Sequence, residues 1–204
     1  MSGFEVPDFQ TMRKSGKVSF DRFTYDLPHN TIQYHTVLHN VWKLSTRATP
    51  TAFHALMDSI ASDRRLLRLY TQNINCIEQS LPDLYERTVQ LHGASNEVLC
   101  QYCGWNGLRI SESFSEACLR CREVALDGEK RGKRISSIGR LRPNMVLYGE
   151  EHSGGETIGA TAEQDIRKGP DAILVAGTTL KAPGAKKLVR EHCRAVKARD
   201  GLTI

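Results

Sequence analysis

The sequence of 204 residues lacks any apolar run close to the roughly 20 residues that a helix needs to cross a bilayer. Its first residues, Met-Ser-Gly-Phe-Glu-Val-Pro-Asp, lack the basic start and the apolar core of a secretory signal peptide. The sequence also lacks an internal repeat. These absences predict a protein of the cell interior that has no membrane partner.

A disulfide framework is not expected either, although the chain has six cysteines. Four of them form two close pairs, Cys100-x-x-Cys103 and Cys118-x-x-Cys121, separated by 14 residues. Each pair places two thiolates on one short turn, and the intervening chain can fold back to complete a tetrahedral shell suited to zinc. Four protein ligands leave no position open for water. We therefore expect one structural zinc ion, with the chemistry elsewhere and the other two cysteines as free thiols.

The composition is that of an ordinary globular protein, with 40% hydrophobic and 25% charged residues. The length allows one sizeable core, or one core with a small insert. A net charge of +5 gives only a mild bias toward acidic partners. Six basic side chains and no acidic one lie between Lys130 and Arg142. Such a run is typical of a nuclear localisation signal or a phosphate-binding segment, but a solvated loop is the simpler interpretation.

Apolar spacing predicts the main elements of the first half of the chain. Residues 11–45 are polar and irregular but allow one or two helices. After Thr49-Pro50, apolar residues recur at helical spacing, which predicts an amphipathic helix that packs on a sheet. Its inward residues would be Phe53, Leu56, Met57 and Ile60. Residues 66–71 and 145–148 have the pattern of strands.

The last part of the chain predicts a βα unit. Residues 171–176 form a short, mostly apolar run, as in a parallel strand that is buried on both faces. The run leads into Gly177-Thr178-Thr179 and then, after Pro183-Gly184, into a helix. Open α/β sheets build nucleotide sites from such units, at the carboxyl ends of their strands. The inward side chains of the helix would be Ala185, Leu188, Val189, Cys193 and Val196.

Six short motifs follow one another along the chain: Val6-Pro7-Asp8-Phe9, Thr71-Gln72-Asn73-Ile74, Leu91-His92-Gly93, the four cysteines, Leu141-Arg142-Pro143 with Tyr148-Gly149-Glu150, and Gly177-Thr178-Thr179-Leu180. In this order they resemble the sirtuin family of NAD-dependent protein deacylases. The resemblance covers nearly the whole chain, and six motifs in the right order are far more specific than any one. The amino-acid sequences of residues 69–73 and 146–150 are most similar to those of the fungal nuclear branch that acts on histones.

The resemblance implies that His92 is the catalytic base. In sirtuins the acyl oxygen attacks the nicotinamide ribose, and a histidine takes a proton from a ribose hydroxyl. Histidine suits this role at neutral pH because its pKa is ordinarily about 6.5. A lone His-Gly pair would more often be a core or capping histidine, and the accompanying motifs reverse that preference.

The resemblance also implies a site for nicotinamide and its ribose. Gln72, Asn73 and Ile74 match the segment that lines this site, where amides offer donors and acceptors and isoleucine offers an apolar wall. By themselves these residues could form only a strand end and its turn. Asn75 stands where sirtuins carry an aspartate that binds the nicotinamide amide. This chain therefore keeps the shape and one acceptor but lacks the charge.

Two further segments match contacts to the cofactor. Asp8 and Phe9 match the mobile cofactor loop, in which Gln10 replaces the usual arginine and removes a cation near the pyrophosphate. Gly177-Thr178-Thr179 would bring backbone amides and hydroxyls to the adenosine part of NAD at a helix start. Without the other motifs, this segment would be interpreted as a tight turn.

A substrate-binding edge is implied for residues 146–150. This edge pairs with the substrate peptide by adding a strand, so that main-chain hydrogen bonds hold any sequence while pockets select the acyl-lysine. A core strand followed by a turn is nearly as good an interpretation. The implied residues are Val146, Leu147, Tyr148, Gly149 and Glu150.

Both ends of the chain depart from the family. Five residues precede Val6-Pro7, which leaves no room for the strand and the Gly-Ala-Gly loop that cradle the pyrophosphate in sirtuins. Residues 201–204 resemble the beginning of a strand whose end would bring an asparagine to the ribose of the cofactor. We therefore expect a sequence that is incomplete at both ends and that shows little or no turnover by itself.

The sequence thus predicts an α/β fold: a Rossmann-like parallel sheet with an inserted small zinc-binding module and a helical segment. The expected domains are an NAD-binding domain (1–10, 46–94 and 141–204), a helical segment (11–45) and a zinc module (95–140). The expected function is NAD-dependent deacetylation of lysines in nuclear proteins, on histone tails or cores, with chromatin association. One alternative is a non-catalytic sirtuin remnant that binds zinc and peptide. Another is a zinc-ribbon nucleic-acid binder, which the basic run favours but the flanking motifs do not explain.

Overall fold

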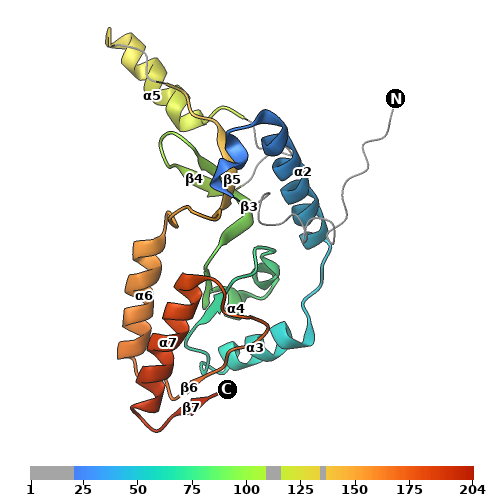
Figure 1. Cartoon of the computed structure of the whole chain (residues 1–204), viewed down its shortest axis with the longest axis vertical. Coiled ribbons are helices and arrows are strands. Elements are labelled where there is room, and N and C mark those ends of the chain that lie inside the picture. The colour runs from blue at the N-terminus through green and yellow to red at the C-terminus, as the bar shows by residue number, and fades with distance from the viewer. Residues whose placement is uncertain (1–20, 109–115, 134–136) are drawn as a thin grey trace. The chain divides into compact units, whose positions relative to one another are not determined.

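A computed structural model describes residues 21–108, 116–133 and 137–204. Within these ranges, no helix is both long and apolar enough to cross a membrane. Figure 1 shows the elements, in which η denotes a 3-10 helix. The helices are η1 (Arg22–Tyr25), α2 (Pro28–Ser45), α3 (Ala52–Ser62), η2 (Ile77–Ser80), α4 (Pro82–Tyr85), α5 (Leu119–Lys130), α6 (Gly155–Arg167) and α7 (Pro183–Lys197). The strands are β1 (Leu69–Thr71), β2 (Thr88–Gln90), β3 (Gly93–Cys100), β4 (Asn106–Leu108), β5 (Leu141–Met145), β6 (Ala172–Ile173) and β7 (Leu202–Thr203).

The described chain divides into two compact units. Unit 1 contains residues 21–48, the short segment Ile74–Cys76 and the described part of His92–His152. Unit 2 contains Thr49–Asn73, Ile77–Leu91 and Ser153–Ile204. Each unit is thus assembled from segments that are far apart in the sequence. The division into three domains that the sequence suggests remains a prediction.

Unit 1 is built on an antiparallel sheet with the strand order β4-β3-β5. Most residues of the central strand β3 are buried. Helix α2 packs against this sheet (Figure 1) and buries Tyr34 and Leu38 almost completely. This confirms the helix expected within residues 11–45. The buried core of the unit consists of Tyr34, Leu38, Val98, Cys100, Cys118, Cys121, Leu141, Met145 and Leu147.

The strand predicted at residues 145–148 lies earlier in the chain, as β5. Leu141, Pro143 and Met145 are buried while the two residues between them are half-buried, which is the period of a strand with one face on the core. Pro143 conceals this period, because proline donates no hydrogen bond to a ladder and is uncommon inside strands. The predicted bounds of this strand are therefore wrong.

The basic run at 130–142 does not form a single solvated loop. Lys130 is the last residue of α5, and Arg142 lies in β5. The Arg142 side chain is 12% exposed and pairs with Glu150 at 3.0 Å. Arg134 lies outside the described residues, and the other described members of the run are exposed. The run is thus divided between a helix end, a loop and an internal ion pair.

Unit 2 contains two parallel strand pairs. Strand β1 lies beside β2, and β6 lies beside β7. A parallel pair needs a crossover, which η2 and α4 provide for the first pair and α7 for the second. The predicted βα unit is confirmed, but β6 covers only two residues of 171–176, and the run is not buried on both faces, since Leu174 is 51% exposed. The backbone pairing continues beyond it, because the Val175 N–H donates to the Ile204 carbonyl at 2.8 Å.

Helix α3 confirms the predicted helix but not its predicted inward face. Met57 is buried, whereas Phe53 and Leu56 are 41% and 55% exposed. The buried face instead runs through His54, Met57 and Ala61. His54 turns inward because its Nδ1 accepts the Thr51 backbone N–H at 3.2 Å, which completes a capping box at the helix start.

A buried carboxylate joins β1 to α6 in unit 2. Asp165 is 1% exposed, and Arg68 donates to its two oxygens at 2.8 and 3.1 Å. The Tyr70 hydroxyl donates to the same carboxylate at 2.8 Å. Burial opposes ionisation, but the hydrogen bonds from Arg68 and Tyr70 outweigh it and lower the pKa of Asp165. These charge-assisted bonds therefore hold α6 against the strand that precedes Gln72.

The variant Arg68→Met is expected to lower the free energy of unfolding by about 3 kcal/mol at pH 7, because it removes the main partner of a buried charge. The pKa of Asp165 is lowered in the folded state, so its stabilising effect is present above the unfolded pKa of about 3.9 and is lost as the pH falls through the folded pKa. The difference in the free energy of unfolding between parent and variant, measured in urea, should therefore narrow below about pH 4.

Arg167→Met, which removes an exposed pair with Glu163, is the matched control and should have little effect. Equal stability of Arg68→Met and parent at pH 7 would contradict this role.

Candidate functional site

The four paired cysteines come together in unit 1. All four sulfur atoms lie within 4.8 Å of one another. The Sγ atoms of Cys100 and Cys121 are 3.7 Å apart, and those of Cys103 and Cys118 are 3.8 Å apart. Four sulfurs placed tetrahedrally at roughly 2.3 Å from a zinc ion would be roughly 3.8 Å apart. The cluster thus fits one structural zinc ion.

Local structure explains how each cysteine reaches the cluster. Cys100 is the last residue of β3, and a tight turn brings Cys103 back beside it, with the Cys103 N–H 3.5 Å from the Cys100 sulfur. Cys118 caps α5, and Cys121 lies in its first turn. Gly139 closes the site from the other side, since a Cβ at this position would lie 2.6 Å from the Cys100 sulfur.

The cluster is buried on one side and open on the other. Cys100, Cys118 and Cys121 belong to the core of unit 1, whereas Cys103 is exposed. A hydrogen bond from the Trp105 backbone lowers the pKa of the Cys103 thiol to about 7. A low pKa favours the thiolate, which is the form that binds metal. Four sulfur ligands are the donor set that suits a soft divalent cation such as zinc.

His92 precedes β3 and is fixed by the backbone on both sides. Its carbonyl accepts the Val146 N–H at 3.1 Å, and the next residue, Gly93, is paired with Met145 of β5. Gly93 has φ +83°, and a Cβ there would overlap the Asn144 carbonyl oxygen. Only glycine fits this position without strain. The close approach of the Asn144 carbonyl thus explains why glycine follows the predicted base.

The segment Ile74–Cys76 lies beside the same strand. The Ile74 carbonyl accepts the Ser95 N–H at 2.9 Å. The Cys76 sulfur lies 3.3 Å from the Ile74 carbonyl oxygen and 3.2 Å from Asn96 Oδ1. Among the described residues, the buried Oδ1 of Asn75 has no hydrogen-bond partner. A buried oxygen of this kind needs a partner, and an amide N–H of a bound ligand would supply it.

Residues Val146–Glu150 follow β5 as an extended segment and a turn, with an isolated bridge between Tyr148 and Asp21, and are held by Arg142. The Arg142 guanidinium donates to Glu150 Oε2 at 3.0 Å and lies over the Tyr25 ring, 5.5 Å from its centroid. The same Glu150 oxygen accepts the Leu147 N–H at 3.3 Å. Tyr148 is 62% exposed at the tip of the turn. Arg142 was not predicted as a site residue, although its place in the Leu-Arg-Pro motif could have indicated it.

Two groups of predicted cofactor residues meet in unit 2. Gln72 follows β1 directly, and its Nε2 donates to Thr178 Oγ1 at 3.0 Å. The same hydroxyl accepts the Leu180 N–H at 3.1 Å, which holds the turn after β6. Gly177 in this turn has φ +65°, a backbone conformation that suits glycine. Asn73 and Thr179 lie next to this contact in the sequence and are exposed.

The position of Gln72 follows from the end of a parallel strand pair. Strands β1 and β2 run side by side, and the Leu91 N–H donates to the Thr71 carbonyl at 2.9 Å beyond the last paired residues. Gln72 is the residue that follows Thr71 at this end of β1. Ligand sites in open α/β sheets are found at such carboxyl ends. Asp8, Phe9 and Gln10 lie outside the described residues, and the roles of all these residues remain predictions.

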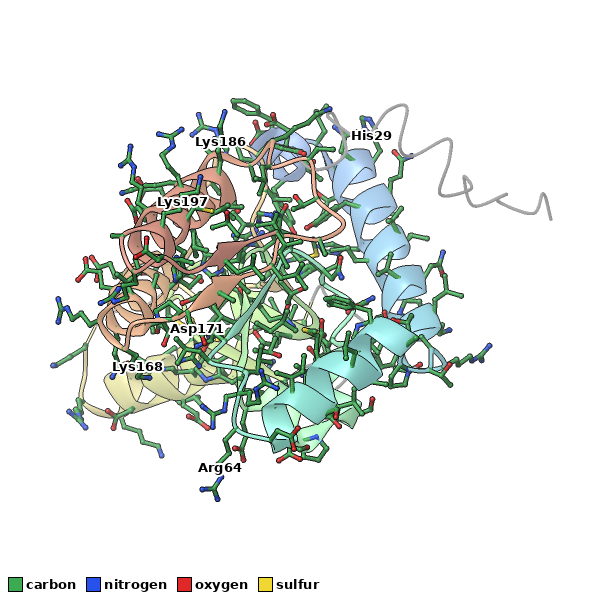
Figure 2. All side chains as sticks on the ribbon, turned by 90° about the horizontal axis from the view of Figure 1, so that it is seen from below. His29, Arg64, Lys168, Asp171, Lys186 and Lys197 are labelled. Atoms are coloured by element: carbon green, nitrogen blue, oxygen red, sulfur yellow. The ribbon has the colours of Figure 1, made fainter. Side chains whose placement is uncertain are left out.

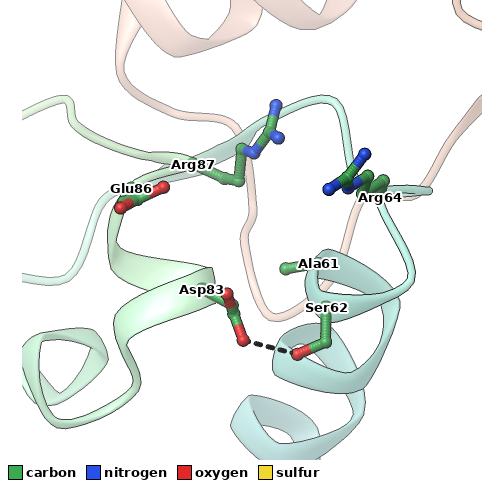
Figure 3. A pocket seen from close by; sticks show the side chains of 6 residues that line it. All are labelled: Ala61, Ser62, Arg64, Asp83, Glu86 and Arg87. Carbon is green, nitrogen blue, oxygen red and sulfur yellow. Dashed lines mark hydrogen bonds between the residues drawn. The ribbon is translucent and has the colours of Figure 1, made fainter.

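A separate polar pocket lies where α3 and α4 meet in unit 2. Its walls are Ala61, Ser62, Arg64, Asp83, Glu86 and Arg87 (Figure 3). The Ser62 hydroxyl donates to Asp83 Oδ2 at 2.7 Å across it. None of the predicted site residues lines this pocket, and nothing in its walls indicates a ligand.

Comparison with known sequences gives a consistent result over most of the chain. Residues 9–183 match the model of the Sir2 family. The NAD-dependent protein deacetylase hst4 of Emericella nidulans is 34% identical over 233 residues, which cover 98% of this chain and 38% of that relative. The NAD-dependent histone deacetylase HST4 of Saccharomyces cerevisiae is 31% identical, with 98% of this chain and 62% of that relative covered. The chain thus spans roughly two fifths to three fifths of their length.

Comparison with solved structures identifies the fold. A Sir2 variant in complex with a deacetylated p53 peptide and 3'-O-acetyl ADP-ribose matches with a TM-score of 0.66 and 19% identity. The match covers 93% of this chain and 72% of that one. The predicted Rossmann-like α/β class is thereby confirmed, and with it the interpretation of the six motifs as a family signature. The chain belongs to the Sir2 family, the sirtuins.

Proposed function

We propose that this protein is an NAD-dependent protein-lysine deacetylase that acts on histones in the nucleus. The curated relatives support the reaction and the substrate class, because they are named as NAD-dependent deacetylases and one of them as a histone deacetylase. The four-cysteine cluster supports the structural zinc. Nuclear action and association with chromatin follow from histones as the substrate.

The observation that carries the proposal is the convergence of three predicted elements at the start of β3. The Ile74 carbonyl is bonded to Ser95, and the His92 carbonyl is bonded to Val146. Three predicted segments therefore lie together at residues 92–95, which are the first residues of β3 and the residue before it. They are the nicotinamide segment, the base and the peptide edge. This arrangement supports a site in which cofactor and peptide are handled together.

The residues of the chain have separable tasks in this reaction. NAD, when bound, supplies the ribose carbon that the acyl oxygen attacks. His92 would hold the proton that leaves a ribose hydroxyl, as a general base. Asn75 would accept a hydrogen bond from the carboxamide at its partnerless buried oxygen. Gln72 and Thr178, which are bonded to each other, would orient ribose hydroxyls.

Arg142 would act as a positioning residue for the peptide. It fixes Glu150, and Glu150 fixes the Leu147 amide. The turn that carries Tyr148 is therefore already ordered before a peptide is added. A preordered edge lowers the entropy cost of adding a strand.

The proposal is tested with the zinc-loaded protein, NAD and an acetylated histone peptide, by following nicotinamide release and loss of the acetyl group. Any turnover should give both signals together and should depend on NAD. A protein that binds the peptide without releasing nicotinamide would instead support the alternative of a non-catalytic zinc- and peptide-binding sirtuin.

The variant Asn75→Asp is expected to strengthen inhibition by nicotinamide. A carboxylate accepts a stronger hydrogen bond from the carboxamide than an amide does, by about 1 kcal/mol, which lowers the inhibitory concentration roughly fivefold. The measurement is a nicotinamide titration of the deacetylation rate. Asn75→Ala is the matched control and should weaken inhibition. If both variants are inhibited like the parent, the nicotinamide site does not use this position.

A further inference from the structure

One face of α7 carries a row of basic side chains. Lys186, Arg190, Arg194 and Lys197 are separated by four, four and three residues. At 3.6 residues per turn, these positions fall within an arc of roughly 80° and extend over roughly 16 Å of helix. All four are exposed. Figure 2 labels Lys186 and Lys197 along the α7 ribbon.

The opposite face of α7 is committed to the interior of unit 2. Ala185, His192 and Val196 are buried at 5%, 7% and 0% exposure. The His192 ring packs edge-on against Tyr70, with ring centroids 5.5 Å apart. The helix cannot turn without losing these contacts. The orientation of the basic row is therefore fixed by the core of the unit.

Within the part of the chain that the structure describes, the charges of the row are not neutralised. Among the described residues, no carboxylate forms a salt bridge with Lys186, Arg190, Arg194 or Lys197, and Glu191 is paired with Lys187. Four unpaired cations in one row repel one another and raise the local potential. Such a row attracts a partner with regularly spaced negative charge.

We propose that this face of α7 binds the phosphate backbone of double-stranded nucleic acid. A duplex carries one negative charge per roughly 1.7 Å of its axis, so a row of roughly 16 Å can face several phosphates at once. Lysine and arginine bind phosphate through charge-assisted hydrogen bonds that do not depend on base sequence. The surface is independent of the proposed deacetylase site and requires no substrate there.

The chemistry of the row favours a duplex over three other partners. A membrane-surface helix needs an apolar face that enters the lipid, whereas the apolar side chains of α7 are buried or half-buried in the protein. Single strands are held by stacking on aromatic side chains, and α7 contains no Phe, Tyr or Trp. Protein partners usually require an apolar or aromatic anchor at the centre of the contact, and the row contains only cations.

The test is fluorescence anisotropy of a labelled 20-base-pair duplex of arbitrary sequence, titrated with the zinc-loaded protein at salt concentrations from 50 to 200 mM. Four phosphate contacts predict a slope of about −3.6 for log affinity against log salt, or a loss of roughly 150-fold over this range. The double variant Arg190→Gln, Arg194→Gln should weaken binding at least roughly tenfold and reduce the slope by about 1.8. Arg190→Lys, Arg194→Lys keeps the charge and should retain binding.

The matched control is Lys130→Gln, Lys133→Gln, which removes the same charge from the exposed end of α5 and from the loop after it. Retained binding in this variant supports the α7 face, and loss of binding only in this variant overturns the proposal in favour of the basic run. Circular dichroism melting shows that each variant is folded before its affinity is compared. A parent protein that does not bind the duplex but binds vesicles with anionic lipid, or polyglutamate, would also overturn it.

Discussion

Replacing Cys103 with serine is expected to abolish stoichiometric zinc binding and to lower the melting temperature sharply. Binding of zinc by four thiolates contributes about 10–16 kcal/mol in small zinc-finger peptides, and in such sites this energy is folding energy. In this protein three of the four ligands belong to the core of unit 1. Loss of the metal therefore removes the bonds that join these core residues. Cys103 is the informative position because it is exposed, and the substitution itself disturbs no packing.

Metal analysis and thermal unfolding measure this effect, with Cys193→Ser as the control. Cys193 lies half-buried on α7 and outside the cluster, so its variant should keep the full zinc content and an unchanged melting temperature. A Cys103→Ser protein that retains one tightly bound zinc ion and melts like the parent would refute the four-ligand assignment.

Replacing His92 with alanine is expected to reduce the rate of deacetylation by roughly 100-fold to 10,000-fold, the usual contribution of a general base. Zinc content should remain that of the parent, because the four cysteines and not His92 form the cluster, and the bond from the Val146 N–H to the His92 carbonyl does not depend on the side chain. The measurements are nicotinamide release and peptide deacetylation under saturating NAD and peptide.

The control for this variant is His29→Ala, which removes an exposed imidazole from α2. Its activity should equal that of the parent (Figure 2 labels the position). If His92→Ala turns over like the parent, His92 is not the base. If it also melts early, its ring has a structural role and the loss of rate cannot be attributed to catalysis.

Predictions from the sequence succeed in this protein where the signal is local. The zinc ligands are set by two pairs of cysteines on short turns, and the structure brings all four together. The βα unit at Gly177 and the helix after Thr49 were predicted for the same reason, since each depends on a few adjacent residues.

The predictions that fail depend on polar contacts, which the spacing of apolar residues does not show. The inward face of α3 is rotated because His54 bonds to Thr51, and a histidine is not counted as apolar in a helical pattern. The basic run is divided because Arg142 pairs with Glu150, which no spacing rule shows. The contact between the Cys76 sulfur and Asn96 joins two elements that are 20 residues apart, and only folding brings them together.

Gly93 affects how genetic screens of this protein would be interpreted. Because its missing side chain makes room for the Asn144 carbonyl, any replacement shifts β3 against β5 and with it the residue before the strand. A screen that scores only product would group Gly93 with His92 as a position required for the reaction. The two differ in kind, since one would handle a proton while the other sets a strand register. Tolerance to mutation near this strand therefore measures backbone geometry as much as chemistry.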